Sequence, residues 1–198
     1  MKSYIITAFR KTVAQDFPAQ ADSLCRVLEQ RLNQLRAENA GASKEKQEHL
    51  ESQILPGIAA YEILQTVMPK ERALQTVHGY VEERAWKLRK IFLALMRIPG
   101  FYRRVPQIFA NELPKMFGPA AGFAFTGLEL VNGTFRADMV RCPYHDTCVQ
   151  YGCPELCPSF CGSDDITYDN LHPNLIWHRT KTLGRGDDCC DFCLEVKQ

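Results

Sequence analysis

The sequence contains no long hydrophobic run. None approaches the roughly 18 apolar residues that a membrane-spanning helix requires, so we expect no transmembrane helix. The amino terminus has an apolar stretch of only about six residues before Arg10 and Lys11, which is shorter than the hydrophobic part of a secretory signal. On these grounds we expect a cytoplasmic protein.

The sequence also lacks an excess of charge of either sign. Its 24 Lys and Arg residues and its 23 Asp and Glu residues are mixed along the chain and leave a net charge of +1. Proteins that bind nucleic acid or an anionic membrane by electrostatics carry a basic face, and this composition predicts none. The partner we expect is a small-molecule substrate. The composition leaves the oligomeric state open, a homo-oligomer included.

Cysteine is almost absent from residues 1–141, where Cys25 stands alone among the nine cysteines of the chain. The others all lie between Cys142 and Cys193. A chain of 198 residues that is 45% hydrophobic can bury a core without disulfides. In a reducing cytoplasm such a cluster therefore predicts a metal site or thiol chemistry rather than a disulfide framework.

Residues 1–117 have the pattern of a helical region. Within Asp22–Leu35 the Leu and Val residues recur every three or four positions, which is the period of a helix buried along one face. A charged helix over 44–55 is expected to end at Pro56-Gly57, and a longer one is predicted over 69–98.

The sequence pattern of residues 118–198 predicts strands joined by cysteine-rich connections. Asn132-Gly133 separates two β-rich runs and predicts a hairpin. A second antiparallel pair is predicted from 175–181 and 190–196. The expected fold class is α+β, with a helical N-terminal half packed on a small antiparallel sheet. We expect the helical region 1–117 and the cysteine-rich α+β region 118–198 to form one compact domain together.

The spacing of the middle cysteines restricts how they can meet. Cys153, Cys157 and Cys161 would form one stripe on an unbroken helix, but Pro158 makes a continuous helix through all three unfavourable. We therefore expect this stretch to bend into a loop, of the kind that turns several thiolates toward one metal or cluster. Cys190 and Cys193 form the single CxxC pair, and on a strand their sulfur atoms point to opposite faces.

Beyond Arg141 an ordered series of short motifs resembles the L-2-amino-thiazoline-4-carboxylic acid hydrolase family. The resemblance covers about the last third of the chain. It rests on Cys142-Pro143-Tyr144, Gly152 with Glu155-Leu156, Phe160-Cys161 followed by Asp164-Asp165, His172-Pro173, His178 through Leu183, and Gly186 through Phe192.

This resemblance implies a hydrolase that opens a cyclic amidine or thiazoline to a carbamoyl-cysteine, acting on a C–N bond of the ring. The positions that coincide with the family pattern are Cys142, Cys161, Asp165, Arg179, Thr182, Gly186, Cys190 and Phe192. Among them, the resemblance assigns catalytic roles to Cys142, Cys161, Asp165 and Cys190.

The chemistry of the reaction suggests more specific roles for some of these residues. We expect Cys161 to supply the thiol and Asp165 to act as its acid–base partner. The substrate-binding candidates are Arg179, Arg185 and Thr182, of which either arginine could hold a carboxylate through two hydrogen bonds.

Five further cysteines, which the family pattern does not require, predict an alternative function. A metal or iron–sulfur site would use them as ligands, with zinc and an iron–sulfur cluster as the candidate cofactors. On that reading the protein is a redox, sensing or small-molecule-binding module. The five are Cys148, Cys153, Cys157, Cys189 and Cys193.

Overall fold

The computed structural model describes residues 3–197, which form helices and one antiparallel sheet. The α-helices are α1 (Tyr4–Asp16), α2 (Ala21–Glu38), α3 (Lys44–His49), α4 (Leu55–Leu64), α5 (Lys70–Met96), α6 (Val105–Met116), α7 (Pro143–Gln150) and α8 (Cys157–Tyr168). Short helical turns are η1 (Leu50–Ile54), η2 (Phe101–Arg104), η3 (Pro119–Ala121), η4 (Pro154–Leu156) and η5 (Leu183–Arg185). The strands are β1 (Ala124–Val131), β2 (Thr134–Arg141), β3 (Leu175–His178) and β4 (Cys190–Val196).

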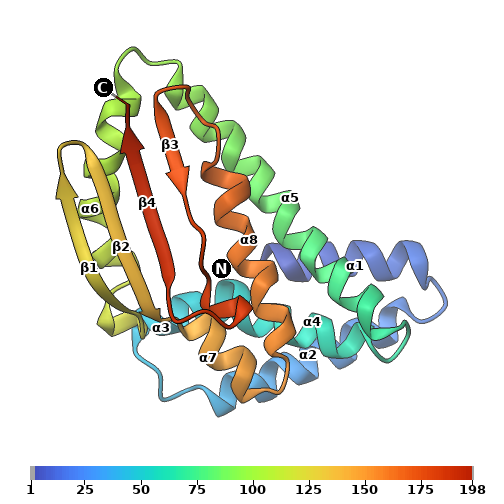
Figure 1. Cartoon of the computed structure of the whole chain (residues 1–198). Coiled ribbons are helices and arrows are strands. Elements are labelled where there is room, and N and C mark those ends of the chain that lie inside the picture. Colours follow the sequence, from blue (N-terminus) through green and yellow to red (C-terminus); the bar gives the residue numbers. More distant parts are fainter. Residues whose placement is uncertain (1–2, 198) are drawn as a thin grey trace.

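The four strands pair in the order β1-β2-β4-β3, and helices cover one face of this sheet (Figure 1). Helix α6 packs on β1, β2 and β4, while α5 and α8 lie side by side next to β3. Helices α1 to α4 gather at the end of the molecule where α8 begins. The predicted α+β class, with the helical half packed on a small antiparallel sheet, is confirmed.

Both predicted strand pairs are present. In the turn between β1 and β2, Asn132 has φ 50° and Gly133 has φ 79°. Two successive residues with positive φ are what the tight turn of a two-residue hairpin requires, and Asn-Gly supplies them at little steric cost. The second pair forms between β3 and β4, with η5 in the connection.

The inner face of the sheet follows the alternation of β2 and β4. Phe135 pairs with Leu194, and Met139 pairs with Cys190, and all four side chains are buried. Ala137 and Phe192, which pair between them, lie on the same face. Arg136 and Asp138, at the alternate positions of β2, are exposed, as alternation along a strand demands. The inner face is therefore the wall on which the helices pack.

The helix that was expected to end at Pro56-Gly57 continues to Leu64, so this prediction is wrong. The π-helical turn η1 precedes α4, and Pro56 is the second residue of α4. Pro56 has no N–H to donate to the turn before it, and the carbonyl of Ser52, four residues earlier, accepts from the Ser3 hydroxyl at 2.9 Å instead. Gly57 continues the helix where Phe160 of α8 approaches so closely that a Cβ at Gly57 would lie 2.6 Å from its Cζ.

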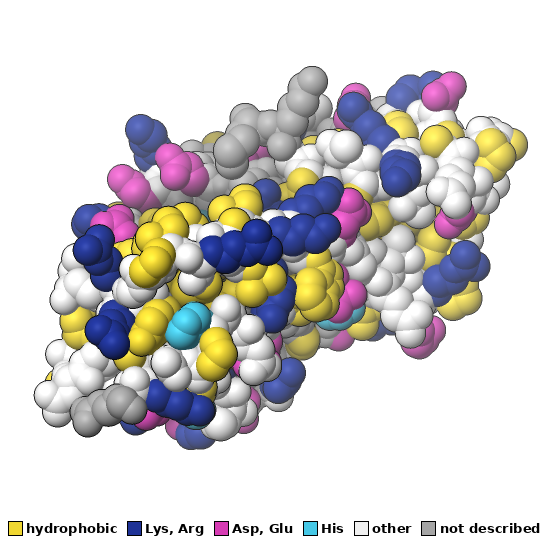
Figure 2. Space-filling view, turned by 90° about the horizontal axis from the view of Figure 1, so that it is seen from above, with side chains coloured by type: hydrophobic (Ala, Val, Ile, Leu, Met, Phe, Trp, Pro, Cys, Tyr) yellow, Lys and Arg dark blue, Asp and Glu magenta, His cyan; other side chains and the backbone are white. Residues whose placement is uncertain are grey.

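The surface shows mixed character. On the face in Figure 2, hydrophobic side chains are interrupted by rows of Lys and Arg side chains. Within residues 3–197, no helix is both long enough and apolar enough to cross a membrane.

Candidate active site

A cavity of about 480 Å³ lies between α8, the inner face of the sheet, α6 and the α3–η1 segment. This volume is in the range of pockets that bind small molecules. Much of its wall is aromatic, from Phe109, Phe117, Phe123, Tyr144, Phe160, Tyr168, Trp177 and Phe192. The polar side chains that line it are its candidate functional groups.

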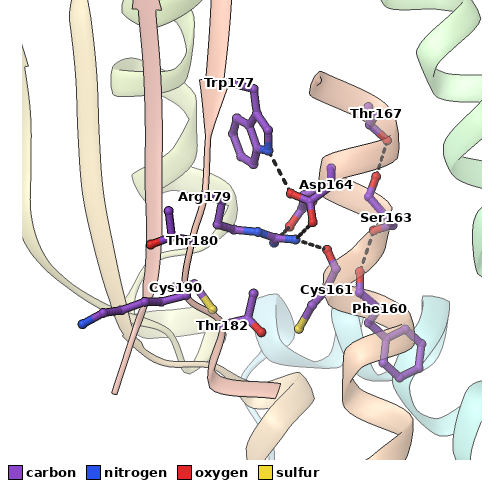
Figure 3. A network of polar contacts seen from close by, with 12 residues as sticks. Phe160, Cys161, Ser163, Asp164, Thr167, Trp177, Arg179, Thr180, Thr182 and Cys190 are labelled. Atoms are coloured by element: carbon purple, nitrogen blue, oxygen red, sulfur yellow. Dashed lines mark hydrogen bonds and ion pairs between the residues drawn. The ribbon is translucent and has the colours of Figure 1, made fainter. Parts of the chain in front are cut away.

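Arg179 makes three hydrogen bonds through its guanidinium. It follows β3, and its side chain is only 2% exposed. Its guanidinium donates to Asp164 at 3.1 Å, to Asp165 at 2.5 Å and to the carbonyl of Cys161 at 2.7 Å, all on α8 (Figure 3). Two carboxylates compensate its buried charge, so the cation is fixed in place.

The two carboxylates that Arg179 holds are not equivalent. Asp165 also accepts a hydrogen bond of 2.9 Å from Trp177 and does not line the cavity. Asp164 does line it, with 38% of its side chain exposed. Burial raises the pKa of Asp164 to about 6, although Arg179 opposes the shift. Of the two, Asp164 is therefore the one able to exchange a proton with a ligand near neutral pH.

Three thiols line the same cavity, from Cys142, Cys161 and Cys190. Cys142 precedes α7, Cys161 is on α8, and Cys190 begins β4, so the fold brings together three residues far apart in sequence. Figure 3 shows the sulfur atoms of Cys161 and Cys190 directed into the space below the Arg179 side chain. The structure thus gathers these three predicted residues around Asp164.

Each of the three thiols is protonated at neutral pH. A hydrogen bond with Cys157, and burial, raise the pKa of Cys161 far above its ordinary value. Burial does the same to the pKa of Cys142. Burial raises the pKa of Cys190 to about 11, with the backbone N–H of Leu183, 3.3 Å away, opposing the rise. A reactive thiolate requires a lowered pKa, which none of them has.

The segment around Pro158 is helical from Cys157 onward, so the predicted loop is wrong for Cys157 and Cys161. Pro158 lies in the first turn of α8, where its missing N–H would have had no partner within the helix. Only Cys153 lies outside α8. The sulfur atoms of Cys157 and Cys161 are 3.9 Å apart, one turn from each other on the helix.

The connection between β3 and β4 packs directly on these two thiols. A Cβ at Gly184 would lie 2.9 Å from the Cys161 sulfur and 3.1 Å from that of Cys157. Glycine is therefore the residue that lets η5 close over the start of α8.

The five cysteines predicted as metal ligands do not converge. Cys148 interacts with Cys153 and Cys157 in the buried core, but Cys193 lies across the strands from Arg136 and His178, on the face opposite Cys190. Cys189 is buried near Asp138 and Asp188. Among residues 3–197, no group of three or more His, Cys, Asp or Glu side chains is arranged to hold a metal ion. The structure gives no support to a metal or iron–sulfur site.

Two of the predicted substrate-binding residues lie outside the cavity wall. Arg185 is exposed at the end of η5. Thr182 is 1% exposed, and its hydroxyl has no hydrogen-bond partner within the described part of the chain. Of the three candidates, only Arg179 lines the cavity.

A hydrogen-bond network between the helical half and Tyr144 of α7 forms another part of the wall. His49 Nε2 donates to the carbonyl of Met116 at 2.9 Å, so in the neutral ring Nδ1 accepts from the Tyr144 hydroxyl at 3.3 Å. Gln53 donates to that hydroxyl at 3.0 Å and accepts from Tyr4 at 3.1 Å. Burial raises the pKa of Tyr144 well above its usual value, so its hydroxyl stays protonated.

Sequence reasoning did not find the cavity residues of the helical half. His49 and Gln53 stand four positions apart, which places them on one helical face, but such a pair on a charged helix carries no signal of its own. Arg84 of α5 also lines the cavity and resembles any other arginine of a polar helix face. Tyr144 belongs to a motif that was recognised, without a role attached to it.

Comparison with known proteins gives one match. The family model for L-2-amino-thiazoline-4-carboxylic acid hydrolase matches residues 47–194, which include η1, α5, α8 and all of the sheet except the last two residues of β4. No curated protein and no solved structure matches the chain. The matched residues contain nearly the entire cavity wall, Glu45 being outside them.

Proposed function

Because the chain belongs to the L-2-amino-thiazoline-4-carboxylic acid hydrolase family, we propose that it hydrolyses a 2-amino-thiazoline carboxylate in this cavity. The observation that carries the proposal is Asp164, a carboxyl group facing the cavity with its pKa raised to about 6. A general base works best when its pKa lies near the working pH.

Asp164 has two tasks in this reaction. Its carboxylate pairs with the protonated amidine of the ring, which orients the carbon between nitrogen and sulfur toward a water molecule. It then accepts a proton from that water as the oxygen bonds to this carbon. Arg179 positions Asp164 and keeps it largely ionised at neutral pH, because a neighbouring cation opposes the effect of burial.

The resulting adduct carries a hydroxyl, an amino group, the ring nitrogen and the ring sulfur on one carbon. It collapses when the carbon–sulfur bond breaks and the sulfur takes up the proton that Asp164 accepted from water. The hydroxyl becomes a carbonyl by giving its own proton to the Asp164 carboxylate, which then releases it to solvent. One water is consumed, and the product is an N-carbamoyl amino acid with a free thiol. We favour this bond over the ring C–N bond expected from the sequence, because a thiol is far more acidic than an amine and leaves more readily.

The three cavity thiols serve as neutral neighbours of the leaving sulfur. Their raised pKa values make nucleophilic attack by Cys142, Cys161 or Cys190 unfavourable compared with attack by water. Tyr144 also lines the cavity, but its hydroxyl donates to His49 Nδ1 and accepts from Gln53. Its one proton is therefore already used and is not assigned to the substrate.

The test is incubation of the purified protein with L-2-amino-thiazoline-4-carboxylate and analysis of the product. We expect a mass gain of one water and one new thiol for each ring opened. An S-carbamoyl product without a free thiol would show that the C–N bond breaks instead. A protein that leaves the ring intact would contradict the proposal.

Replacing the thiols separates water attack from thiol attack. We expect Cys161→Ser and Cys190→Ser to retain activity within about tenfold of the wild type, because neither thiol bonds to the substrate. Loss of about a thousandfold or more in one variant, together with a covalent adduct on that cysteine in the wild type, would establish a thiol nucleophile. Cys193→Ser, on the opposite face of the sheet, is the matched control.

A further inference from the structure

Three cationic side chains line the cavity, and two of them already have acidic partners. Arg179 pairs with Asp164 and Asp165, and Lys115 pairs with Glu112 at 2.8 Å. Arg84 has no ion pair with a carboxylate among residues 3–197. Among the cationic side chains that line the cavity within residues 3–197, Arg84 is therefore the one whose charge is still available to a ligand.

Arg84 is held in position without its hydrogen-bonding edges being used. It lies on α5, four residues after the buried Tyr80 and three after Val81, so it stands at the edge of the buried face. Its guanidinium stacks on the Tyr4 ring, 4.7 Å from the centroid. Stacking uses the flat face of the guanidinium and leaves the N–H groups at its edge free to donate.

The Tyr4 ring on which Arg84 stacks is connected to the cavity wall by hydrogen bonds. Tyr4 donates to Gln53, and Gln53 donates to the Tyr144 hydroxyl. Gln53, Tyr144 and Arg84 all line the cavity. The Arg84 guanidinium is thus part of a polar region of the wall, to which the π-helical turn η1 contributes Gln53.

The part of the cavity around Arg179 is unsuited to an anion. With both carboxylates ionised, Arg179, Asp164 and Asp165 together carry one net negative charge. Such a group attracts a cation such as an amidinium and repels a carboxylate. Most donors of Arg179 are already directed at α8, which leaves few for a ligand.

We propose that Arg84 binds the carboxylate of the substrate while Asp164 binds its amidinium, so that the cavity selects small amidines that also carry an acid group. This inference rests on the proposed function for the identity of the ring. It replaces the expectation that Arg179 or Arg185 holds the carboxylate. Arg84 is a specificity-determining residue and takes no part in bond breaking.

The test compares two ligands that differ only in the carboxylate, L-2-amino-thiazoline-4-carboxylate and 2-amino-thiazoline. Calorimetry measures the binding of each, and turnover is measured separately. Arg84→Gln is expected to weaken binding of the carboxylate ligand roughly tenfold, the order of one charge-assisted hydrogen bond, and to raise its KM with kcat nearly unchanged. Binding of 2-amino-thiazoline should stay the same, and Arg84→Lys should restore part of the loss.

Arg72→Gln, an exposed arginine on the same helix, is the matched control and should change neither ligand. Equal weakening of both ligands by Arg84→Gln, or no effect on either, would overturn the inference, as would a wild type that binds neither ring. A wild type that binds the carboxylate ligand through Arg84 without opening it would refute the hydrolysis and leave the anion site standing.

Discussion

At the scale of the residue, the proposed hydrolysis depends on Asp164. It shares Arg179 with Asp165, but only Asp164 lines the cavity, and burial raises its pKa to about 6. The sequence predicts Asp165 as the acid–base residue, whereas the carboxyl group that lines the cavity is that of Asp164. Side chains of neighbouring residues on a helix point about 100° apart, so the two carboxylates face different surroundings. Trp177 and Arg179 both hydrogen-bond to Asp165, which is why Asp165 has a structural role.

Because the pKa of Asp164 is raised, we predict that its contribution to the free energy of unfolding decreases as the pH rises. Its folded pKa of about 6 lies above the ordinary value of 3.8, so its contribution to stability is present at low pH and is lost as pH rises toward 6 and beyond. Asp164→Asn removes this dependence. We expect the stability of the variant relative to the wild type to rise by about 1 kcal/mol from pH 4 to pH 7.5, after allowing for solvent screening.

Urea unfolding at the two pH values measures this difference. A constant difference between the two proteins would mean that Asp164 has an ordinary pKa in the folded state.

At the scale of elements, the contact of α8 with α4 and η5 positions the thiols and Phe160. Two glycines permit it, Gly57 under the Phe160 ring and Gly184 against the sulfur atoms of Cys157 and Cys161. The sequence predicted the hairpin at Asn132-Gly133, because a local turn decides it. It did not predict that α4 continues through Pro56-Gly57, because the need for glycine there arises from a helix about 100 residues away.

Gly57→Ala should destabilise the protein by about 1–3 kcal/mol, because its Cβ would meet the Phe160 ring at 2.6 Å. The ring lines the cavity, and a shift toward it would narrow the space for a ligand, so we also expect weaker substrate binding. Thermal unfolding and KM measure the two effects.

Gly79→Ala, in the middle of α5, is the matched control. A Cβ at Gly79 would meet nothing within 4 Å, so the change should stabilise the helix by about 0.5–1 kcal/mol. Similar effects of the two substitutions would show that the contact with Phe160 is not tight.

At the scale of the whole molecule, the cavity belongs to both halves of the chain. Arg84, His49 and Gln53 come from the helical region, whereas Asp164, Arg179 and the three thiols come from the region after residue 118. The fold class followed from local patterns, helical periodicity and one turn. The cavity wall, which both regions of the chain build together, could not be predicted from the sequence. It depends on how α5 and η1 pack on α8 and α7.

We predict that the two regions unfold together. One hydrophobic core runs from Ile5 of α1 to Cys190 of β4, so neither region can keep its core alone. Calorimetry should show one transition, with equal calorimetric and van't Hoff enthalpies. Two resolved transitions would mean that residues 1–117 and 118–198 are separate domains.

The most direct test of hydrolysis by Asp164 is the pH dependence of kcat/KM for L-2-amino-thiazoline-4-carboxylate, measured for the wild type and for Asp164→Asn. The wild type should lose activity as pH falls through about 6, because the base becomes protonated. The variant should be about a hundred- to ten-thousandfold slower, without that loss near pH 6. A variant that keeps wild-type activity, or the same fall near pH 6, would show that another group is the base.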